Sequence, residues 1–356
     1  MWICTRTRVR AVLALGLVLV LWLALGPETR NRKWSPIPSS SPESVPNPPS
    51  FRYLQRPPDC PPGRPVPLVA LVHSAPNHGP LRRLLRKTWA RTTPRVRLVF
   101  LLGDVEPGSA RTALEEEARR YRDVVRGDFI DSYRNLTYKH LMGLTWASER
   151  CPEARLLLKM DDDIFVHYFR LKSVIERLPQ DDHLSCYVHR KMAVVRHPGS
   201  KWYVSEREYP DSHFPDFCSG WAYLLGPSAA RRLVRASRLF PYFWVDDVHV
   251  TGTLARAAGL KLHPLDSLYA LDADSLARWA RSPDRRDWNY VFGPTLGDPD
   301  LTLRAHLKAL RCGMEGCRRG PEPGQWATVA ARGRAERVDM GRDIRPGKVV
   351  SSFSSL

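Results

Sequence analysis

Short apolar runs alternate with amphipathic segments from residue 68 onward. Runs rich in Val, Leu and Ile predict strands, whereas apolar residues spaced three and four positions apart predict helices. In chain order the predicted elements are strand 68–72, helix 81–91, strand 97–102, helix 109–122, strand 124–133, helix 136–149, strand 155–160 and helix 169–178. This alternation is typical of parallel strands joined by crossover helices.

The rest of the pattern is shorter and less uniform. It predicts strands 185–195, 201–204 and 217–225, helix 227–237, helix 248–259 and strand 260–265. In open α/β sheets, ligands bind beyond the carboxyl ends of the strands. We therefore expect one α/β domain with a mostly parallel central sheet flanked by helices and a nucleotide site at that edge.

Three consecutive carboxylates, Asp161, Asp162 and Asp163, directly follow the strand 155–160. Adjacent like charges repel one another, and solvent or a divalent cation can offset that repulsion. Carboxylate oxygens suit Mg²⁺, Mn²⁺ or Ca²⁺. Asp161 and Asp163 therefore form an Asp-x-Asp pair that fits a metal ion bridging two phosphates, and a solvated acidic turn is the alternative.

A second acidic pair, Asp246 and Asp247, precedes the predicted helix 248–259. Acidic residues in this position usually cap the helix, so position alone favours a structural role. His263 lies on the predicted strand 260–265. It is a candidate metal ligand, although a single histidine is more often structural.

The first 26 residues predict a membrane anchor. Residues 11–26 carry no charge, and Arg6, Arg8 and Arg10 precede them. This fits a short membrane span with its basic flank in the cytosol. A cleavable signal peptide is the alternative, but Pro27 would follow the cleavage site and hinder cleavage.

The chain is accordingly divided into five parts by its composition. We expect a cytosolic tail 1–10, an anchor 11–26, a Pro- and Ser-rich extended stem 27–66, a lumenal domain 67–312 and a basic, Gly-rich, loose tail 313–356.

Cysteine usage and charge support a lumenal domain. The six cysteines beyond the anchor are even in number and scattered, which predicts disulfides rather than a zinc site: Cys60, Cys151, Cys186, Cys218, Cys312 and Cys317. Asn135 begins an Asn-Leu-Thr glycosylation sequon. The formal net charge of +18 suits an anionic donor or an anionic lipid surface. Nucleic acid is disfavoured as a partner because the chain has an anchor, a stem and a sequon but no nucleic-acid-binding motif.

Five motifs in order resemble the β-1,3-glycosyltransferase family, which includes β-1,3-galactosyltransferases and β-1,3-N-acetylglucosaminyltransferases of the Golgi membrane. They lie at 82–89 (RRLLRKTW), 101–103 (LLG), 128–139 (DFIDSYRNLTYK), 159–166 (KMDDDIFV) and 245–248 (VDDV). The resemblance covers about residues 67–312. Residues 200–203, 209–212 and 217–220 are more similar to the galactosyltransferase branch.

The resemblance implies a GT-A-like fold and an inverting transfer from a UDP-sugar to an oligosaccharide hydroxyl on protein or lipid, with a β-1,3 linkage. Galactose is the expected sugar. The alternatives are N-acetylglucosamine as donor sugar, a catalytically silent glycan-binding relative, and a basic binding module without chemistry. The resemblance also implies a type II protein of the Golgi membrane with a lumenal catalytic domain.

The family's site residues can be placed on this sequence. Asp163, with Asp161 and His263 as further candidate ligands, would bind Mn²⁺, and Asp247 would be the general base. The donor would be recognised by residues around the first strand, the first helix and the acidic turn: Ser74, Arg82, Arg86, Asp131, Tyr133, Asp161 and Asp162. For the two arginines, ion pairs that fix the helix to the sheet are an equal alternative.

Two positions depart from the family pattern. Ala222 stands where the family usually has glycine, which adds a methyl group near the expected sugar site. Asp246 stands where the family usually has glutamate. Both raise the possibility of a relative without activity.

Overall fold

The computed structural model describes residues 51–64, 66–88, 96–178, 182–282 and 286–319. All of them belong to the unit Glu43–Leu356. The predicted anchor, most of the stem, the tryptophan that ends the first motif and most of the C-terminal tail lie outside the described residues. Within them, no helix combines the length and the apolar character that a membrane span requires.

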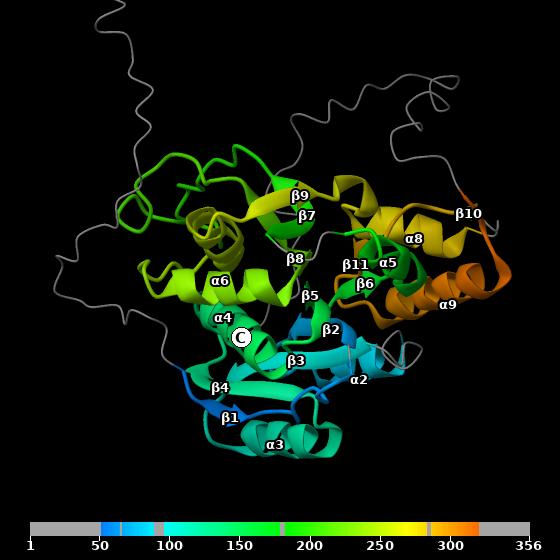
Figure 1. Ribbon diagram of the computed structural model, residues 1–356, viewed down its shortest axis with the longest axis horizontal. Helices are drawn as coiled ribbons and strands as arrows, with labels where there is room; N and C mark the ends of the chain where they lie inside the picture. Colours follow the sequence, from blue (N-terminus) through cyan, green and yellow to red (C-terminus); the bar gives the residue numbers. More distant parts are fainter. Residues whose placement is uncertain (1–50, 65, 89–95, 179–181, 283–285, 320–356) are drawn as a thin grey trace, which may run out of the picture. The chain divides into compact units, whose positions relative to one another are not determined.

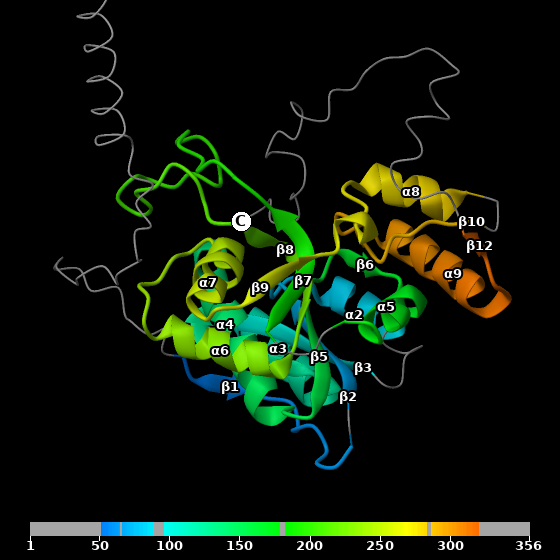
Figure 2. The same ribbon diagram turned by 45° about the horizontal axis from the view of Figure 1, so that its top comes forward.

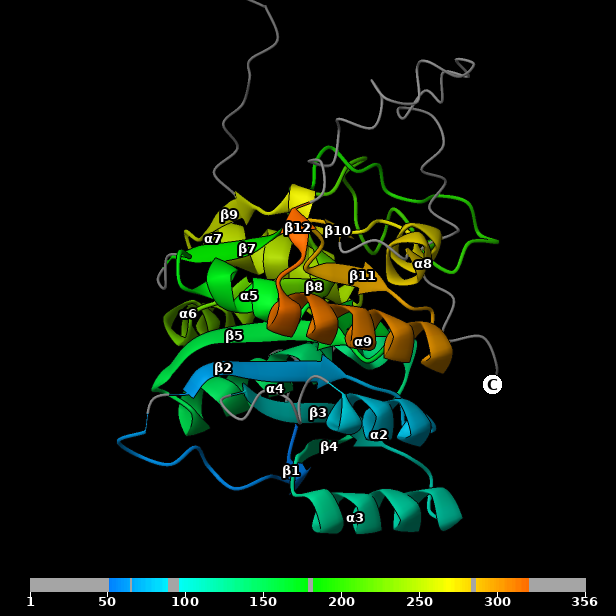
Figure 3. The same cartoon turned by 90° about the vertical axis from the view of Figure 1, so that its right-hand side faces the viewer.

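An eight-stranded sheet forms the centre of the protein (Figure 1). Figure 3 shows β5, β2, β3 and β4 side by side. From one edge to the other, the strands are β1 (Tyr53–Gln55), β4 (Val124–Ile130), β3 (Val96–Asp104), β2 (Val66–His73), β5 (Ala154–Asp161), β8 (Phe217–Leu225), β7 (His183–His189) and β9 (Lys261–Pro264).

The sheet is mixed, so the expectation of a mostly parallel sheet is wrong. Strands β4, β3, β2 and β5 are mutually parallel, as the strand–helix alternation predicts. However, β8 enters between β5 and β7 and is antiparallel to both, and β1 is antiparallel to β4. The long segment between β7 and β8 lets the chain return beside β5 without a crossover helix.

Helices cover both faces of the sheet, which explains the unbroken apolar runs of its central strands. In β2, Val69 and Leu71 pack toward α4 (Leu136–Arg150) and α6 (Pro227–Ser237). The alternate residues of β2 pack in a second cluster with α2 (Gly79–Lys87), α3 (Ser109–Tyr121) and α5 (Tyr168–Ile175).

A small additional layer follows the acidic turn. Strand β6 (Ile164–Val166) pairs antiparallel with β11 (Phe292–Pro294). Beside them, α8 (Ala273–Arg281) lies alongside α9 (Pro299–Glu315), as Figure 2 shows. None of the elements beyond residue 265 is predicted from the sequence. The shorter elements of the described chain are η1 (Tyr133–Asn135), the π-helix η2 (Val248–Leu254), α7 (Ala255–Ala257), η3 (Asp266–Leu268), β10 (Arg286–Asp287) and β12 (Arg318–Arg319).

Other expected elements differ locally. The predicted strand 201–204 is wrong, because these residues form a turn and an irregular segment in the long connection between β7 and β8. The predicted helix 248–259 begins as a π-helix and ends at Ala257.

The prediction of disulfide bonds is confirmed. The three bonds are Cys60–Cys151, Cys186–Cys218 and Cys312–Cys317. The second ties β7 to β8, the strand that is antiparallel to both of its neighbours.

We expect the bond between β7 and β8 to contribute more to stability than the one at the C-terminal end of α9. The two bonds join cysteines 32 and 5 positions apart. Chain entropy of the unfolded state then gives about 4 kcal/mol for the first and about 2 kcal/mol for the second. Denaturant unfolding of the Cys186→Ala/Cys218→Ala and Cys312→Ala/Cys317→Ala proteins measures the difference. Equal losses would mean that loop length does not govern these bonds.

Candidate active site

A cavity of about 260 Å³ lies at the carboxyl ends of β2 and β5, where the sequence predicts a ligand crevice. Strand register places His73 of β2 directly opposite Asp161 of β5. The backbone N–H of Asp162 donates to the His73 carbonyl oxygen at 3.0 Å. The wall also includes residues 219–221 of β8 and residues 244–248, which lead into η2.

The three carboxylates of the acidic turn have different surroundings. Asp162 is buried and accepts hydrogen bonds from the Ser74 hydroxyl at 2.6 Å and from His78 Nδ1 at 2.9 Å. Its hydrogen bond raises the pKa of His78 above the ordinary value, although burial acts in the opposite direction. Asp162 therefore holds the loop after β2 in place.

Asp161 and Asp163 lie on either side of Asp162 and both line the cavity. Asp161 accepts from Lys159 Nζ at 2.8 Å. The carbonyl oxygen of Asp163 accepts from the backbone N–H and the hydroxyl of Thr295, at 2.8 and 2.7 Å, which fixes the turn against the segment after β11. Two carboxylates facing one cavity from a fixed turn are a donor set that fits Mn²⁺ or Mg²⁺.

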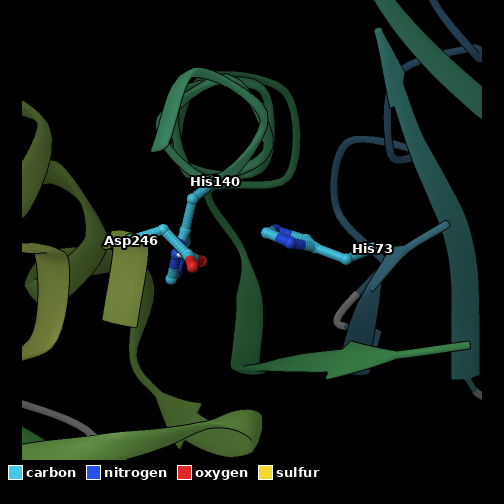
Figure 4. Close-up of side chains that lie close together, drawn as sticks. All are labelled: His73, His140 and Asp246. Carbon is cyan, nitrogen blue, oxygen red and sulfur yellow. Dashed lines mark hydrogen bonds and ion pairs between the residues drawn. The ribbon is translucent and has the colours of Figure 1, made fainter. Parts of the chain in front are cut away.

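A second group could also hold a metal ion. His73, His140 and Asp246 each offer a ligand atom within 4.8 Å of the others, and Figure 4 shows the His73 imidazole pointing toward the other two side chains. Two nitrogens and one oxygen suit Zn²⁺ or Cu²⁺ better than Mn²⁺. Both His140 nitrogens already have hydrogen-bond partners, Asp246 and Tyr223. The acidic turn is therefore the better fit for the expected Mn²⁺.

Asp247 both caps a helix and lines the cavity. Its Oδ1 accepts from the backbone N–H of Val248 at 2.8 Å, so it caps η2, and it lines the cavity. Burial, together with the adjacent Asp246 charge, raises its pKa to about 7. A carboxylate with such a pKa can accept a proton near neutral pH.

Asp246 has the opposite electrostatic situation. Burial alone would raise its pKa, but the hydrogen bond with His140 and the Lys159 charge hold it below the ordinary value. His140 Nδ1 lies 2.8 Å from Asp246 Oδ2. The two neighbouring acids therefore divide into an ionised Asp246 and a proton-accepting Asp247.

Gly220 brings β8 close to this acidic pair. A Cβ atom at position 220 would lie 2.9 Å from the Asp247 Cβ atom, a distance that real Cβ contacts do not reach. The neighbouring Ala222 is fully buried in the core and is not part of the cavity wall. Its methyl group therefore does not intrude on the site, contrary to the expectation from sequence.

The residues expected to recognise the donor are only partly brought together. Ser74, Tyr133, Asp161 and Asp162 line the cavity. Asp131 instead accepts from the Gly103 N–H at 2.7 Å and from Lys139 Nζ at 2.9 Å. It lies under the wall rather than in it.

Arg82 and Arg86 do not line the cavity. Each forms an ion pair with Glu117 of α3 at 2.7 Å, and Arg86 also pairs with Asp123 at 2.7 Å. Arg82 additionally donates to the Ser74 hydroxyl at 2.9 Å. The geometry thus shows the alternative role, in which the arginines fix α2 to its surroundings.

Two further predicted residues lie apart from the cavity wall. His263 is exposed on β9, with its ring 6.3 Å from that of His183. Asn135 is partly exposed and donates from Nδ2 to the Ile130 carbonyl oxygen at 2.8 Å. Its sequon partner Thr137 is buried and donates to the Phe243 carbonyl oxygen at 2.7 Å. The metal-binding role of His263 and the glycosylation of Asn135 stay predictions.

The aromatic and small residues 217–225 predict a strand that a sugar ring approaches, and Trp221 of that strand lines the cavity. Trp202, Trp244 and the buried His140 are not predicted as site residues. Trp202, Trp221 and Trp244 line the cavity, and flat aromatic faces of this kind suit the apolar faces of sugar rings. His140 is 1% exposed within the helix predicted over 136–149. The one feature of the sequence that could have indicated His140 is that a polar residue stands on the buried face of this helix, where it needs hydrogen-bond partners.

Comparison with known proteins identifies the family. A galactosyltransferase family model matches residues 81–266. The chain is 39% identical over 212 residues to human acetylgalactosaminyl-O-glycosyl-glycoprotein beta-1,3-N-acetylglucosaminyltransferase, a match that covers 56% of this chain and 55% of the relative. It is 31% identical over 205 residues to beta-1,3-galactosyltransferase 5 of Gorilla gorilla gorilla, covering 56% of this chain and 68% of that relative.

The matched part thus spans about half the length of the human and mouse N-acetylglucosaminyltransferases. Among solved structures, a glycosyltransferase involved in glycosylation of the major capsid of PBCV-1 matches with a TM-score of 0.37 and 10% identity, over 68% of this chain and 98% of that one. Because the family model covers just over half of the sequence, this chain belongs to the galactosyltransferase family, and its resemblance to the β-1,3-glycosyltransferases is confirmed.

Proposed function

We propose that this protein is an inverting β-1,3-glycosyltransferase that transfers galactose from UDP-galactose to an oligosaccharide hydroxyl. The observation that carries the proposal is one cavity that joins two carboxylates suited to a divalent cation with a partly buried carboxylate, Asp247, suited to accept a proton. A glycosyl transfer from a nucleotide diphosphate needs both functions.

Donor binding falls to the acidic turn in this proposal. Asp161 and Asp163 would hold Mn²⁺, which when bound neutralises charge on the diphosphate. Lys159 is buried and donates to Asp161 and to the Gly220 carbonyl oxygen, so it holds the turn and β8 in a fixed relation. The hexose would then lie against residues 219–221, between the turn and Asp247.

Asp247 would perform the proton transfer. It takes the proton from the acceptor hydroxyl while that oxygen forms a bond to the anomeric carbon, and the bond from that carbon to the UDP oxygen breaks. Attack from the face opposite UDP converts an α-linked donor into a β-linked product. The acceptor sugar would lie against the tryptophans of the cavity wall.

The sugar specificity is proposed from the galactosyltransferase-like segments 200–203, 209–212 and 217–220. UDP-N-acetylglucosamine is the competing donor, because relatives of both kinds match this chain. The purified full-length chain should be assayed with each UDP-sugar, Mn²⁺ and a panel of β-linked acceptors, with the linkage of the product determined by NMR. Absence of transfer from any UDP-hexose would overturn the proposal.

We also propose that residues 11–26 anchor the protein in the Golgi membrane with residue 67 onward in the lumen. The three disulfides support an oxidising compartment. The uncharged residues 11–26, preceded by Arg6, Arg8 and Arg10, support the anchor. If N-terminal sequencing found that the mature protein begins near residue 27, the segment would be a cleaved signal peptide and not an anchor.

We expect Asp163→Asn to abolish manganese-supported transfer while the protein stays folded, because the metal loses one charged ligand at a cavity-facing turn. The measurement is the transfer rate as a function of Mn²⁺ concentration. Asp162→Asn is the matched control. It should lower the melting temperature, since Asp162 holds Ser74 and His78, but keep the same manganese dependence. A fully active Asp163→Asn protein would place the metal elsewhere.

Asp247→Asn should slow transfer by roughly 10² to 10⁴-fold, because an amide cannot act as a general base. Asparagine still caps a helix, so stability should change by no more than about 1 kcal/mol. UDP affinity in the presence of Mn²⁺ should persist. The comparison protein is Asp246→Asn, which should be impaired much less. If Asp246→Asn is the slower enzyme, the base is misassigned.

The pH profile offers an independent check on Asp247. Its raised pKa of about 7 means that the carboxyl is protonated and inactive as a base below that pH. We therefore expect kcat/KM for the acceptor to rise with pH through about 7 and then level off. In Asp246→Asn the like charge is gone, so the rising limb should move to lower pH. An unmoved limb in that variant would argue against coupling of the two acids.

A further inference from the structure

His140 is a buried histidine whose two ring nitrogens both have partners. It lies on α4, close to the cavity but not in its wall, and is 1% exposed. Nδ1 lies 2.8 Å from Asp246 Oδ2, and Nε2 contacts the Tyr223 hydroxyl on β8. One side chain therefore connects a helix, a sheet strand and the acidic pair.

The direction of these hydrogen bonds follows from the charge on Asp246. An ionised carboxylate only accepts, so His140 must donate from Nδ1. Burial lowers the pKa of His140, which favours the neutral ring. Its Nε2 then accepts from the Tyr223 O–H, and both nitrogens are satisfied.

Three further groups pack around the hydrogen-bonded pair of His140 and Asp246: one lysine and two buried histidines. Lys159 of β5 adds positive charge beside Asp246. His73 of β2 lies with its ring edge-on to His140, 5.1 Å between centroids, and burial lowers its pKa. His249 of η2 is also buried, with a pKa lowered to about 4. Two groups of the described chain donate to the Asp246 carboxylate, the backbone N–H of Asp247 and the His140 ring, and His140 supplies the side-chain hydrogen bond.

Without the His140 donor, the largely buried Asp246 carboxylate would lose its side-chain hydrogen bond and keep only the backbone donor. Such a group turns toward solvent or takes up a proton. Because Asp246 adjoins Asp247, either change would alter the backbone turn that presents Asp247 to the cavity. Asp246 is also one methylene shorter than the glutamate expected from the sequence motif, and the imidazole of His140 reaches it.

We infer that His140 is a positioning residue, which holds Asp246 through its Nδ1 and thereby keeps Asp247 aimed at the acceptor hydroxyl. This inference rests on the proposed function. His140 touches neither substrate, and its effect should appear in the rate of the chemical step rather than in donor binding.

Two amide substitutions separate the two nitrogens of the ring. In His140→Asn, the amide nitrogen takes the place of Nδ1 and can still donate to Asp246. In His140→Gln, the amide takes the place of Nε2 and can still meet Tyr223, but Asp246 loses its donor. We expect kcat to stay within about threefold of wild type for His140→Asn and to fall by roughly 10 to 100-fold for His140→Gln, because a small misplacement of a reacting group costs up to about 10²-fold.

The assay uses the full-length chain with Mn²⁺, the donor that supports transfer and its acceptor, and records kcat and KM together with UDP affinity. Donor KM and UDP affinity should remain at wild-type values in both variants. Thr145→Ala is the control, since Thr145 is on the same helix and its hydroxyl donates to the Leu141 carbonyl oxygen at 2.8 Å, away from the acidic pair. It should not change kcat.

Each outcome gives a decision. Wild-type kcat in His140→Gln, or equal losses in the Asn and Gln variants, overturns the inference and leaves the proposed function intact. If wild type transfers no hexose, the proposed function fails and the inference fails with it. Should His140→Gln not fold, His140→Asn decides alone, because a loss of more than about tenfold in its kcat at unchanged UDP affinity contradicts the positioning role.

Discussion

The buried ammonium group of Lys159 joins the two acidic segments of this protein. It donates to Asp161 at the end of β5 and to the Gly220 carbonyl oxygen of β8, and its charge lowers the pKa of Asp246. A buried lysine is costly unless such partners surround it. The antiparallel entry of β8 beside β5 supplies them. The cavity therefore depends on the pairing of β5 with β8, which brings Gly220 into contact with the ammonium group of Lys159, about 60 positions earlier in the chain.

The sequence predicts the first half of the fold well because its strands are buried on both faces. Their apolar runs are unbroken, and the intervening helices carry a clear period. The position of β8 is different. Its apolar pattern gives no direction of pairing, and the long connection before it is compatible with either edge of the sheet. The elements after residue 265 add no strand to the main sheet, and β11 pairs with β6 instead, so no strand–helix alternation predicts them.

The site could be predicted where chemistry and position coincide. Asp161 and Asp163 follow a central strand, and Asp247 precedes a helix, so their neighbourhoods follow from the order of elements. The role of Asp162 in holding Ser74 and the ion pairs of Arg82 depend on side-chain orientation, which spacing alone does not give. His140 was missed because a hydrogen bond to Asp246 crosses 106 positions of sequence.

The contact between Gly220 and Asp247 has a consequence for redesign. Since any side chain at position 220 would meet the Asp247 Cβ atom, variation there would displace the proposed base before it alters sugar choice. The neighbouring Trp221 also lines the cavity but carries no such restriction in its backbone. A combinatorial library that aims to change the accepted sugar should therefore hold position 220 constant and randomise position 221, where shape can change without cost to proton transfer.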